Sequence, residues 1–428
     1  MSTKVKVLYN TFVQLLGRFF TAGVTYLTTL MLVRGYGAEG YGEFVKILTY
    51  ISYFYIFTDF GANAYVVKKM AEDESLGKKL LGNLLALRLF FSLLLVFFSL
   101  AFLAVLPQGI GQGFTLVTRI GVIIGSFTIV AQGLLTTTSA WFQQKLRYDK
   151  ATIALVVGNI FTLLLVYIMT VQDLSVYYVF VAYVLGQFIS VLVSFLLIEE
   201  RFLPLFDFSL WRKIFYFSWP LGLTLVFNLV YFKVDSFILT LTRPTEEVGI
   251  YGLAYKFFEM AIIFPSFFMN ALYPVFLKKL KEAPQSLSAL TKKIGLFLVG
   301  AALVLTIVLL VLAPLLINFT AGDQQVDFRG GIMTLRILSL SLPAFFLSGF
   351  FMWVLITAEK QILLVPFYGF SMVLNIVLNT LLIPRYGYLA AASTTLITEV
   401  VVTFLLTLPV YSILKKNPSY LLNLKKTK

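Results

Sequence analysis

The sequence contains no cysteine and no histidine. Without cysteine, the chain can form neither disulfides nor thiolate metal sites. Without histidine, it lacks the side chain that most often carries protons and binds metals near neutral pH. Any catalysis would therefore depend on carboxylates alone.

Charged residues are scarce at 13% of 428 residues, whereas 59% are apolar and the mean hydropathy is +0.91. Soluble domains average roughly 45–50% apolar residues, so this composition indicates a protein of the lipid bilayer. The apolar run after Lys4 and Lys6 continues well beyond the roughly 7–15 residues of a signal-peptide core, and no small-residue cleavage site follows it. We expect this first span to be retained.

Twelve apolar runs are long enough to cross a bilayer, which takes about 20 residues. They cover residues 9–33, 44–66, 82–105, 116–141, 151–171, 175–198, 215–241, 252–275, 294–318, 333–357, 361–383 and 388–412. Continuous runs of this kind lack the alternation of a membrane β-barrel. The sequence therefore predicts an all-α integral membrane protein with twelve transmembrane helices.

Lysine and arginine are concentrated in alternate connections and in the two tails, which together hold 23 of them. The opposite connections hold only 4, namely Arg34, Arg243, Arg329 and Arg385. The positive-inside rule then places both termini in the cytoplasm. This bias and attraction to anionic lipid head groups account for most of the net charge of +14, so we do not expect nucleic-acid binding.

An internal repeat relates the two halves of the chain. Tyr41, Gly42 and Lys46 recur as Tyr251, Gly252 and Lys256, Arg119 recurs as Arg336, and Asn159-Ile160 recurs as Asn375-Ile376. Six spans in each half give parallel repeats, which in transporters enclose the substrate site between them. We expect an N-terminal six-helix lobe at 1–198, a cytoplasmic linker at 199–214, and a C-terminal lobe with a short basic tail at 215–428, arranged with pseudo-symmetry around a central cavity.

Charged side chains at bilayer depth are costly and normally face water or a partner inside the bundle. The spans contain seven cations, Arg18, Lys46, Arg88, Arg119, Lys233, Lys256 and Arg336, and four acids, Asp59, Asp235, Glu259 and Glu399. The excess of positive charge suits an anionic substrate such as a pyrophosphate or an acidic sugar, and it argues against organic cations.

The first span carries a polar stripe formed by Asn10, Gln14, Arg18, Thr21, Thr25 and Thr28. Their spacing places all six on one helical face, so this face could line a cavity. Hydrogen bonding between helices is the alternative for the threonines, but it leaves Arg18 in need of an anion or water.

The seventh span contains Lys233 and Asp235, which lie on opposite sides of the helix and cannot pair with each other. Each is either a functional group or one member of a structural ion pair. Glu399, near the middle of the last span, is protonated, paired across helices, or a cation-coupling site. Lys46 and Lys256 open their spans, where a lysine can also extend its ammonium toward the membrane surface.

Several motifs occur in a characteristic order along nearly the whole chain. They are the run Arg34 to Phe44, Asp59-Phe-Gly61, Trp219-Pro220, Asp235, Val248 to Tyr255, Pro274, Asn375-Ile376, Ile383 to Gly387 and Ala390 to Ala392. This ordered set resembles the polysaccharide-transport branch of the multidrug/oligosaccharidyl-lipid/polysaccharide (MOP) exporter superfamily, the family of O-antigen and capsule oligosaccharide flippases.

The resemblance implies two six-helix lobes and transfer of an undecaprenyl-pyrophosphate-linked oligosaccharide across the inner membrane by alternating access. It implies a transporter rather than an enzyme, with membrane lipids and other polysaccharide-assembly membrane proteins as partners. We expect Arg18, Arg88 and Lys233 to hold the head group, with Lys46, Lys256, Arg119 and Arg336 as further cavity cations. Asp235, Glu399, Asp59 and Glu259 are candidates for binding a coupling Na⁺ or proton, and no other cofactor is expected.

Three alternatives remain. A multidrug and toxin extrusion (MATE) antiporter also has twelve spans, although its motifs fit less well. Lipid II flippases of the superfamily usually have two further spans. A membrane glycosyltransferase or polymerase generally needs a sizeable external loop, and the outward connections here are short.

Overall fold

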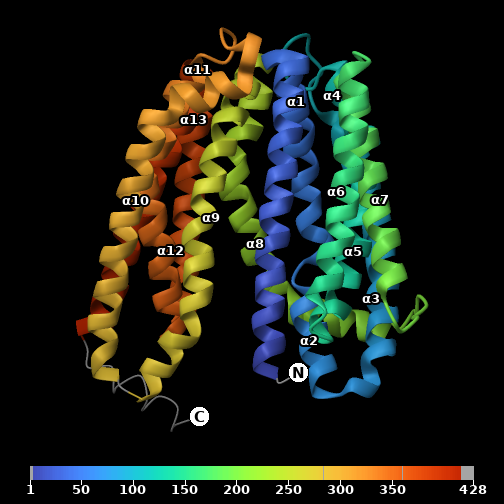
Figure 1. Ribbon diagram of the computed structural model, residues 1–428, viewed down its shortest axis with the longest axis vertical. Coiled ribbons are helices and arrows are strands. Elements are labelled where there is room, and N and C mark those ends of the chain that lie inside the picture. Colours follow the sequence, from blue (N-terminus) through green and yellow to red (C-terminus); the bar gives the residue numbers. More distant parts are fainter. Residues whose placement is uncertain (1–2, 283, 359, 416–428) are drawn as a thin grey trace. The chain divides into compact units, whose positions relative to one another are not determined.

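The computed structural model describes residues 3–282, 284–358 and 360–415, and nearly all of them are helical (Figure 1). The first helices are α1 (Thr3–Asp59), α2 (Ala62–Glu72), α3 (Gly77–Val105), α4 (Leu116–Gly125), α5 (Phe127–Gln144), α6 (Tyr148–Val171) and α7 (Val179–Leu197). They are followed by α8 (Phe208–Thr242), α9 (Thr245–Glu282), α10 (Pro284–Ala321), α11 (Gly330–Leu340), α12 (Leu342–Thr357) and α13 (Leu364–Lys415). One-turn 3₁₀ helices occur at η1 (Glu74–Leu76), η2 (Val176–Tyr178), η3 (Gly322–Gln324) and η4 (Gln361–Leu363). No strand forms within these described ranges.

Within the described ranges, ten helical stretches are long and apolar enough to cross a membrane. Two of them, Leu16–Glu72 and Leu364–Ile413, are each broken by a glycine with positive φ, Gly37 at 65° and Gly387 at 61°. Glycine reaches this backbone region without the steric cost that a side chain would add. Each glycine separates two of the predicted spans, so the twelve-span, all-α membrane fold is confirmed.

Three predicted spans contain a break that the apolar runs do not predict. The span 44–66 bends at Phe60 and Gly61, where φ is 41° and 81°. The spans 116–141 and 333–357 break at Ser126 and Ser341, whose hydroxyls donate to the carbonyls of Val122 and Leu338. Such local bonds compete with the helical pattern. The two serines occupy similar places in the internal repeat, so both halves share this feature.

The chain forms two compact units, which are described separately. Unit 1 contains Met1–Leu229 and Pro244–Gly249, and unit 2 contains Val230–Arg243 and Ile250–Lys428. The residues expected to form a linker, 199–214, belong to unit 1. The reason is that Leu205 N donates to Gly82 O at 3.0 Å and Asp207 N donates to the Asn83 side chain at 2.8 Å, which attach this segment to α3. The basic tail at 416–428 lies outside the described residues.

Small residues let helices of unit 1 approach closely. In α6 and α7, which lie side by side in Figure 1, Gly158 and Gly186 face each other. A Cβ added to Gly158 would lie 1.8 Å from Ser190 Oγ and 2.4 Å from Gly186 O. In membranes, close packing of this kind replaces the hydrophobic drive that water supplies to soluble proteins.

Unit 2 is packed mainly through aromatic and aliphatic side chains. Its helices α10 and α13 both pack against α11 and α12. Phe345 of α12 contacts Phe258 of α9 with ring centroids 5.3 Å apart, and the neighbouring Phe346 contacts Phe264 at 5.9 Å. These phenylalanines tie α9 to α12.

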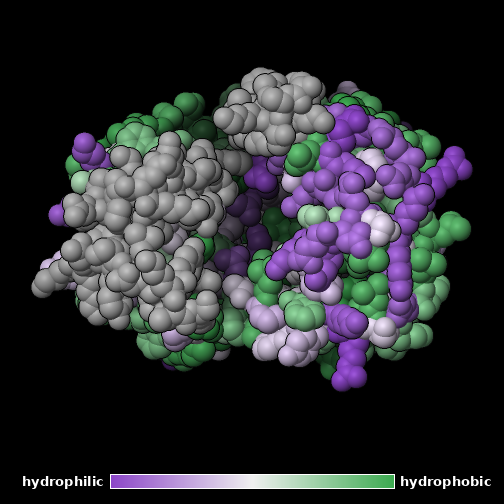
Figure 2. All heavy atoms as spheres, turned by 90° about the horizontal axis from the view of Figure 1, so that it is seen from below, coloured by the Kyte–Doolittle hydropathy of each residue, from purple (hydrophilic) through white to green (hydrophobic). Residues whose placement is uncertain are grey.

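Hydrophilic residues gather over the end of unit 1 that carries α2 and the start of α3 (Figure 2). Ion pairs there include Lys79 with Asp207 at 3.3 Å, Lys145 with Glu74 at 3.2 Å, and Lys150 with Glu199 at 2.8 Å. The hydrogen bond from Lys150 holds the pKa of the Glu199 carboxyl below its usual value. This end carries connections that the charge distribution assigns to the cytoplasm.

Gly158→Val should destabilise the protein, because the new side chain would collide with Ser190 and with the backbone of Gly186. Overpacking of this kind typically costs about 1–3 kcal/mol. Gly300→Val in α10 is the matched control, since a Cβ at Gly300 meets no atom within 4 Å. Thermal unfolding in detergent should show a lower midpoint for Gly158→Val only. Equal midpoints for the two variants would contradict the close packing of α6 on α7.

Candidate functional site

Unit 2 contains a partly exposed cluster of two lysines and one carboxylate. Lys233 of α8 lies 3.5 Å from Glu259 of α9, and Lys256 lies 3.6 Å from the other oxygen of the same carboxylate. The Lys233 ammonium also lies 5.2 Å from the centroid of the Tyr255 ring. The three charged side chains keep 27%, 28% and 37% of their surface exposed. The cluster carries one excess positive charge, and ammonium groups with three donors each can bind a further anion.

Asp235 lies on the other side of α8 and is almost completely buried. Its two oxygens accept hydrogen bonds from the Tyr251 hydroxyl and from the Ser236 backbone N–H. Thr395 of α13 in turn interacts with Tyr251. Lys233 and Asp235 thus take different partners, as their helical spacing predicts.

Glu399 in α13 is also buried, and its carboxylate accepts hydrogen bonds from two hydroxyl groups. Tyr231 donates at 2.6 Å and Ser348 donates to the other oxygen. No lysine or arginine pairs with Glu399 among the described residues. The carboxylate is therefore held by neutral donors, in contrast to Glu259.

A polar seam runs along α13 beside Glu399. The Asn375 amide donates to the Thr398 hydroxyl at 3.2 Å, and the Asn379 amide donates to the Asn375 oxygen at 2.9 Å. The Asn379 side-chain oxygen is buried and has no hydrogen-bond partner in the described part of the chain. Buried oxygens of this kind normally have a hydrogen-bond partner, so the Asn379 oxygen is an unused acceptor in this seam.

In unit 1, Arg88 of α3 is buried and holds the corner between α1 and α2. Its guanidinium donates to Asp59, to the Asn63 side chain at 2.9 Å, to Thr58 O at 3.1 Å and to Thr137 at 3.3 Å. Asp59 also accepts the backbone N–H of Asn63 at 3.2 Å. The planar fork of arginine can make all these bonds at once, and they fix the bend at Phe60 and Gly61.

Lys46 of α1 belongs to a second buried network of unit 1. Its ammonium donates to Gly113 O at 3.0 Å and to the Thr245 hydroxyl, and it lies 3.7 Å from Glu43. Glu43 also accepts hydrogen bonds from Thr115 and Thr118. This network ties the glycine-rich segment 107–114 and the first turn of α9 to α1.

Arg119 and Arg336, which match in the internal repeat, each donate to a backbone carbonyl. Arg119 binds Leu106 O at the end of α3 at 2.6 Å, and Arg336 binds Leu310 O in α10 at 3.2 Å. The Leu310 carbonyl needs a partner because residue 314, four positions later, is a proline without an N–H. Arg336 therefore compensates for the proline.

A family model described as polysaccharide biosynthesis protein matches residues 7–280. The chain belongs to this family. A second model, described as MatE, matches residues 220–381. Together with the structural likenesses below, these matches place the protein in the MOP exporter superfamily. No individually curated protein matches the sequence.

Solved structures of the superfamily share the fold. The chain is similar to an inward-facing multidrug resistance MATE family transporter, with TM-score 0.74, 14% identity, and coverage of 95% of this chain and 96% of the other. It is similar to the lipid II flippase MurJ in an inward closed conformation, with TM-score 0.70, 15% identity, and coverage of 95% and 90%. A MOP superfamily transporter from Pyrococcus furiosus gives TM-score 0.59, 14% identity, and coverage of 96% and 95%. At these identities the likeness concerns the fold.

In the structure of this member of the polysaccharide biosynthesis family, the predicted site residues lie in different surroundings. Lys233, Lys256 and Glu259 come together, and Asp59 pairs with Arg88. Arg88, Lys46, Arg119 and Arg336 all bind groups of the protein itself, so their roles toward substrate stay predictions.

Arg18 has an exposed side chain in α1, and its substrate role also stays a prediction. Two threonines of its stripe, Thr25 and Thr28, bond to carbonyls of their own helix. The Asn10 side chain, at the start of the stripe, lies outside the described residues.

The sequence does not identify Tyr231, Tyr251 and Ser348 as hydroxyl donors, because each lies on a different helix from the acid that it binds. The pair Asn375 and Asn379 could have been found, since a four-residue spacing places both amides on one face of an apolar helix. That signal was present in the sequence.

Arg336→Leu should destabilise the polysaccharide-family protein by roughly 1–3 kcal/mol, because it leaves the Leu310 carbonyl without a donor. Pro314→Ala restores an N–H for that carbonyl. Added to Arg336→Leu, it should recover part of the loss, and thermal unfolding of both single variants and the double variant measures this coupling. Strictly additive effects would show that Arg336 does not compensate for Pro314.

Proposed function

We propose that this multi-pass membrane protein is a flippase that transfers an undecaprenyl-pyrophosphate-linked oligosaccharide, an O-antigen or capsular repeat unit, from the cytoplasmic to the outer face of the inner membrane. The observation that carries the proposal is the polysaccharide biosynthesis family match over residues 7–280 of a chain with a MOP transporter fold. One protein of similar structure, MurJ, is a lipid II flippase, and this supports a lipid-linked substrate. Both termini lie in the cytoplasm in this proposal, which follows the distribution of lysine and arginine.

The pyrophosphate is recognised by Lys233 and Lys256. Each lysine is more than 3.4 Å from Glu259, so the carboxylate holds both ammonium groups loosely and leaves donors for phosphate oxygens. A pyrophosphate offers several charged acceptors, and charge-assisted bonds are roughly twice as strong as neutral ones. Partial burial strengthens them further because local screening by water is reduced.

Transport proceeds by alternating access, in which the binding site opens first to one side of the membrane and then to the other. A coupling Na⁺ or proton binds in unit 2, at Asp235 or at Glu399 with the neighbouring α13 seam. Asp235 and Glu399 accept hydrogen bonds from hydroxyl groups, and the α13 seam adds the side-chain oxygens of Asn375 and Asn379. Carboxylate and amide oxygens are ligands for hard cations. Other polysaccharide-assembly membrane proteins are the expected partners.

Multidrug/cation antiport is the second candidate, because the MatE model matches residues 220–381. An organic cation would need an accessible acid. Asp235 and Glu399 are buried among hydroxyl donors, and the accessible Glu259 is outnumbered by two lysines. The charges of unit 2 therefore favour an anionic substrate. Two results together would favour antiport instead. Cells would export drugs only when they contain this protein, and lipid-linked glycan would still reach the outer face when the protein is removed.

Replacing both Lys233 and Lys256 by glutamine should lower flipping of an undecaprenyl-pyrophosphate oligosaccharide about a hundred-fold, the loss expected when two charge-assisted interactions disappear. Proteoliposomes with a fluorescent oligosaccharide and a membrane-impermeant quencher measure the rate. Lys69→Gln, at an exposed lysine paired with Glu72, is the control and should flip normally. Undiminished flipping by the folded double variant would reject this site.

Ion coupling makes a separate prediction. An imposed sodium or proton gradient should accelerate wild-type flipping about ten-fold or more. Asp235→Asn or Glu399→Gln should abolish this acceleration. Asp327→Asn, at an exposed acid near the start of α11, should keep that response. Wild-type flipping that ignores the sodium, proton and voltage gradients would remove the coupling proposal.

A further inference from the structure

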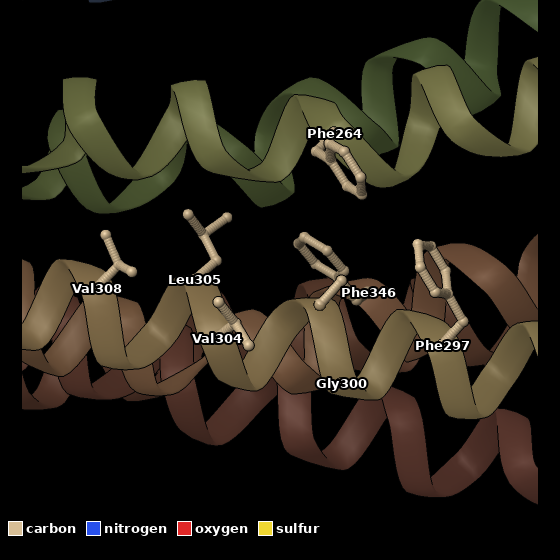
Figure 3. Close-up of a pocket in the computed structure, with 8 residues that line it drawn as sticks. Phe264, Phe297, Gly300, Val304, Leu305, Val308 and Phe346 are labelled. Carbon is tan, nitrogen blue, oxygen red and sulfur yellow. The ribbon is translucent and has the colours of Figure 1, made fainter.

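An apolar groove lies in unit 2 between α9, α10 and α12 (Figure 3). Its volume is about 550 Å³. The residues that define it are Phe264 of α9, Phe297, Gly300, Val304 and Val308 of α10, and Phe346 of α12. In Figure 3, Phe264 faces the α10 side chains across the open space. All the described residues that line the groove are apolar.

Aromatic rings form one end of the groove and small residues give it depth. Phe264 stacks on Phe346 at 5.9 Å, and Phe268 stacks on Phe297 at 5.0 Å. At Gly300, an added Cβ would meet no heavy atom within 4 Å. The groove is therefore space left open by the side chains of α10, and its volume lies within the roughly 300–1,000 Å³ typical of ligand sites.

A hydrocarbon chain suits this space. The described side chains that line the groove include no polar one, so a polar molecule would lose its hydrogen bonds to water without replacement. An empty groove would forfeit dispersion contacts along its whole lining. Phe264, Val304 and Phe346 each lie near the middle of a predicted span, at 252–275, 294–318 and 333–357. The groove is therefore at the depth of the bilayer's hydrocarbon.

Helix α9 carries Lys256 and Glu259 of the charged cluster and also one wall of the groove. Lys256 and Phe264 are eight residues apart in α9, which corresponds to about 12 Å along the helix axis. A lipid with its phosphates at Lys233 and Lys256 would thus have its hydrocarbon chain start within reach of the groove. The methyl-branched chain of an isoprenoid would contact phenylalanine and valine side chains along the walls.

We infer that this groove binds the polyisoprenyl chain of the lipid-linked substrate while its pyrophosphate is held at Lys233 and Lys256. The inference rests on the proposed function and adds to it a second binding element on unit 2. The first isoprene units next to the pyrophosphate lead from Lys256 to the groove, the units that follow occupy the groove, and the remainder extends into the bilayer. Substrate chain length then affects transport through specific contacts with the protein.

Photocrosslinking tests occupancy directly. An aliphatic diazirine amino acid about the size of leucine, which is small enough to leave the groove open, replaces Val304 in the groove or, as control, Ile307 outside it, on the same helix and with a similar exposed fraction of 60% against 62% for Val304. The full-length protein is placed in phosphatidylglycerol and phosphatidylethanolamine vesicles that contain a radiolabelled undecaprenyl-pyrophosphate oligosaccharide. Val304 should label the substrate several-fold more than Ile307 does, and unlabelled substrate should compete. Equal labelling at the two positions, or crosslinks at Val304 to phospholipid alone, would overturn the inference.

Transport of two chain lengths gives a functional test. Val304→Trp fills the groove and should slow flipping of the undecaprenyl substrate about ten-fold, while a geranyl-linked analogue should flip as in wild type. Ile307→Trp should leave both rates unchanged, and Gly300→Leu provides a second groove-filling variant if Val304→Trp fails to fold. If both folded groove variants flip the undecaprenyl substrate normally, the groove does not bind the chain, although the flippase function stands. If the wild type flips neither substrate, the proposed function itself fails.

Discussion

The cost of placing a charge in hydrocarbon governs the interior of both units. Arg88 and Lys46 in unit 1, and Asp235 and Glu399 in unit 2, are each almost fully buried. Each of the four has a charged group that bonds to at least one partner on another helix. An unpartnered charge at these places would cost several kcal/mol, so each network must form as its helices pack. The helices can therefore pack only in an arrangement that gives each buried charge its partners.

The same requirement applies to the backbone. Glycine, proline and serine interrupt the long apolar helices, and the carbonyls released by these breaks need donors. Arg336 supplies one for Leu310, opposite Pro314, and Arg119 supplies one for Leu106. The repeated arginines, which look like ligands in the sequence, thus stabilise breaks and ends of helices. In this protein, arginines within the membrane spans therefore stabilise the helices by donating to backbone carbonyls.

Lys233, Lys256 and Glu259 differ from these groups because they are only partly buried and their charges do not cancel. Helix α9, which carries Lys256 and Glu259, also contributes Phe264 to an apolar groove. A charged site next to an apolar groove suits an amphiphilic substrate with an anionic head and a hydrocarbon chain. Transporters with the same fold handle different cargoes, because the fold fixes the scaffold and the side chains select the ligand.

The sequence by itself determined the class of fold. Continuous runs of about 20 apolar residues are satisfied in a bilayer only as helices, and their number, together with the ordered motifs from Arg34 to Ala392, predicted a twelve-span transporter of the MOP superfamily. Charge spacing on one helix also showed that Lys233 and Asp235 take different partners, because helical geometry is local. Hydroxyl donors such as Tyr231 and Ser348 could not be assigned to Glu399, since they are 168 and 51 residues away in the chain. Only the tertiary structure decided which charges are neutralised and where a groove remains, because both depend on side chains that meet only when the helices pack.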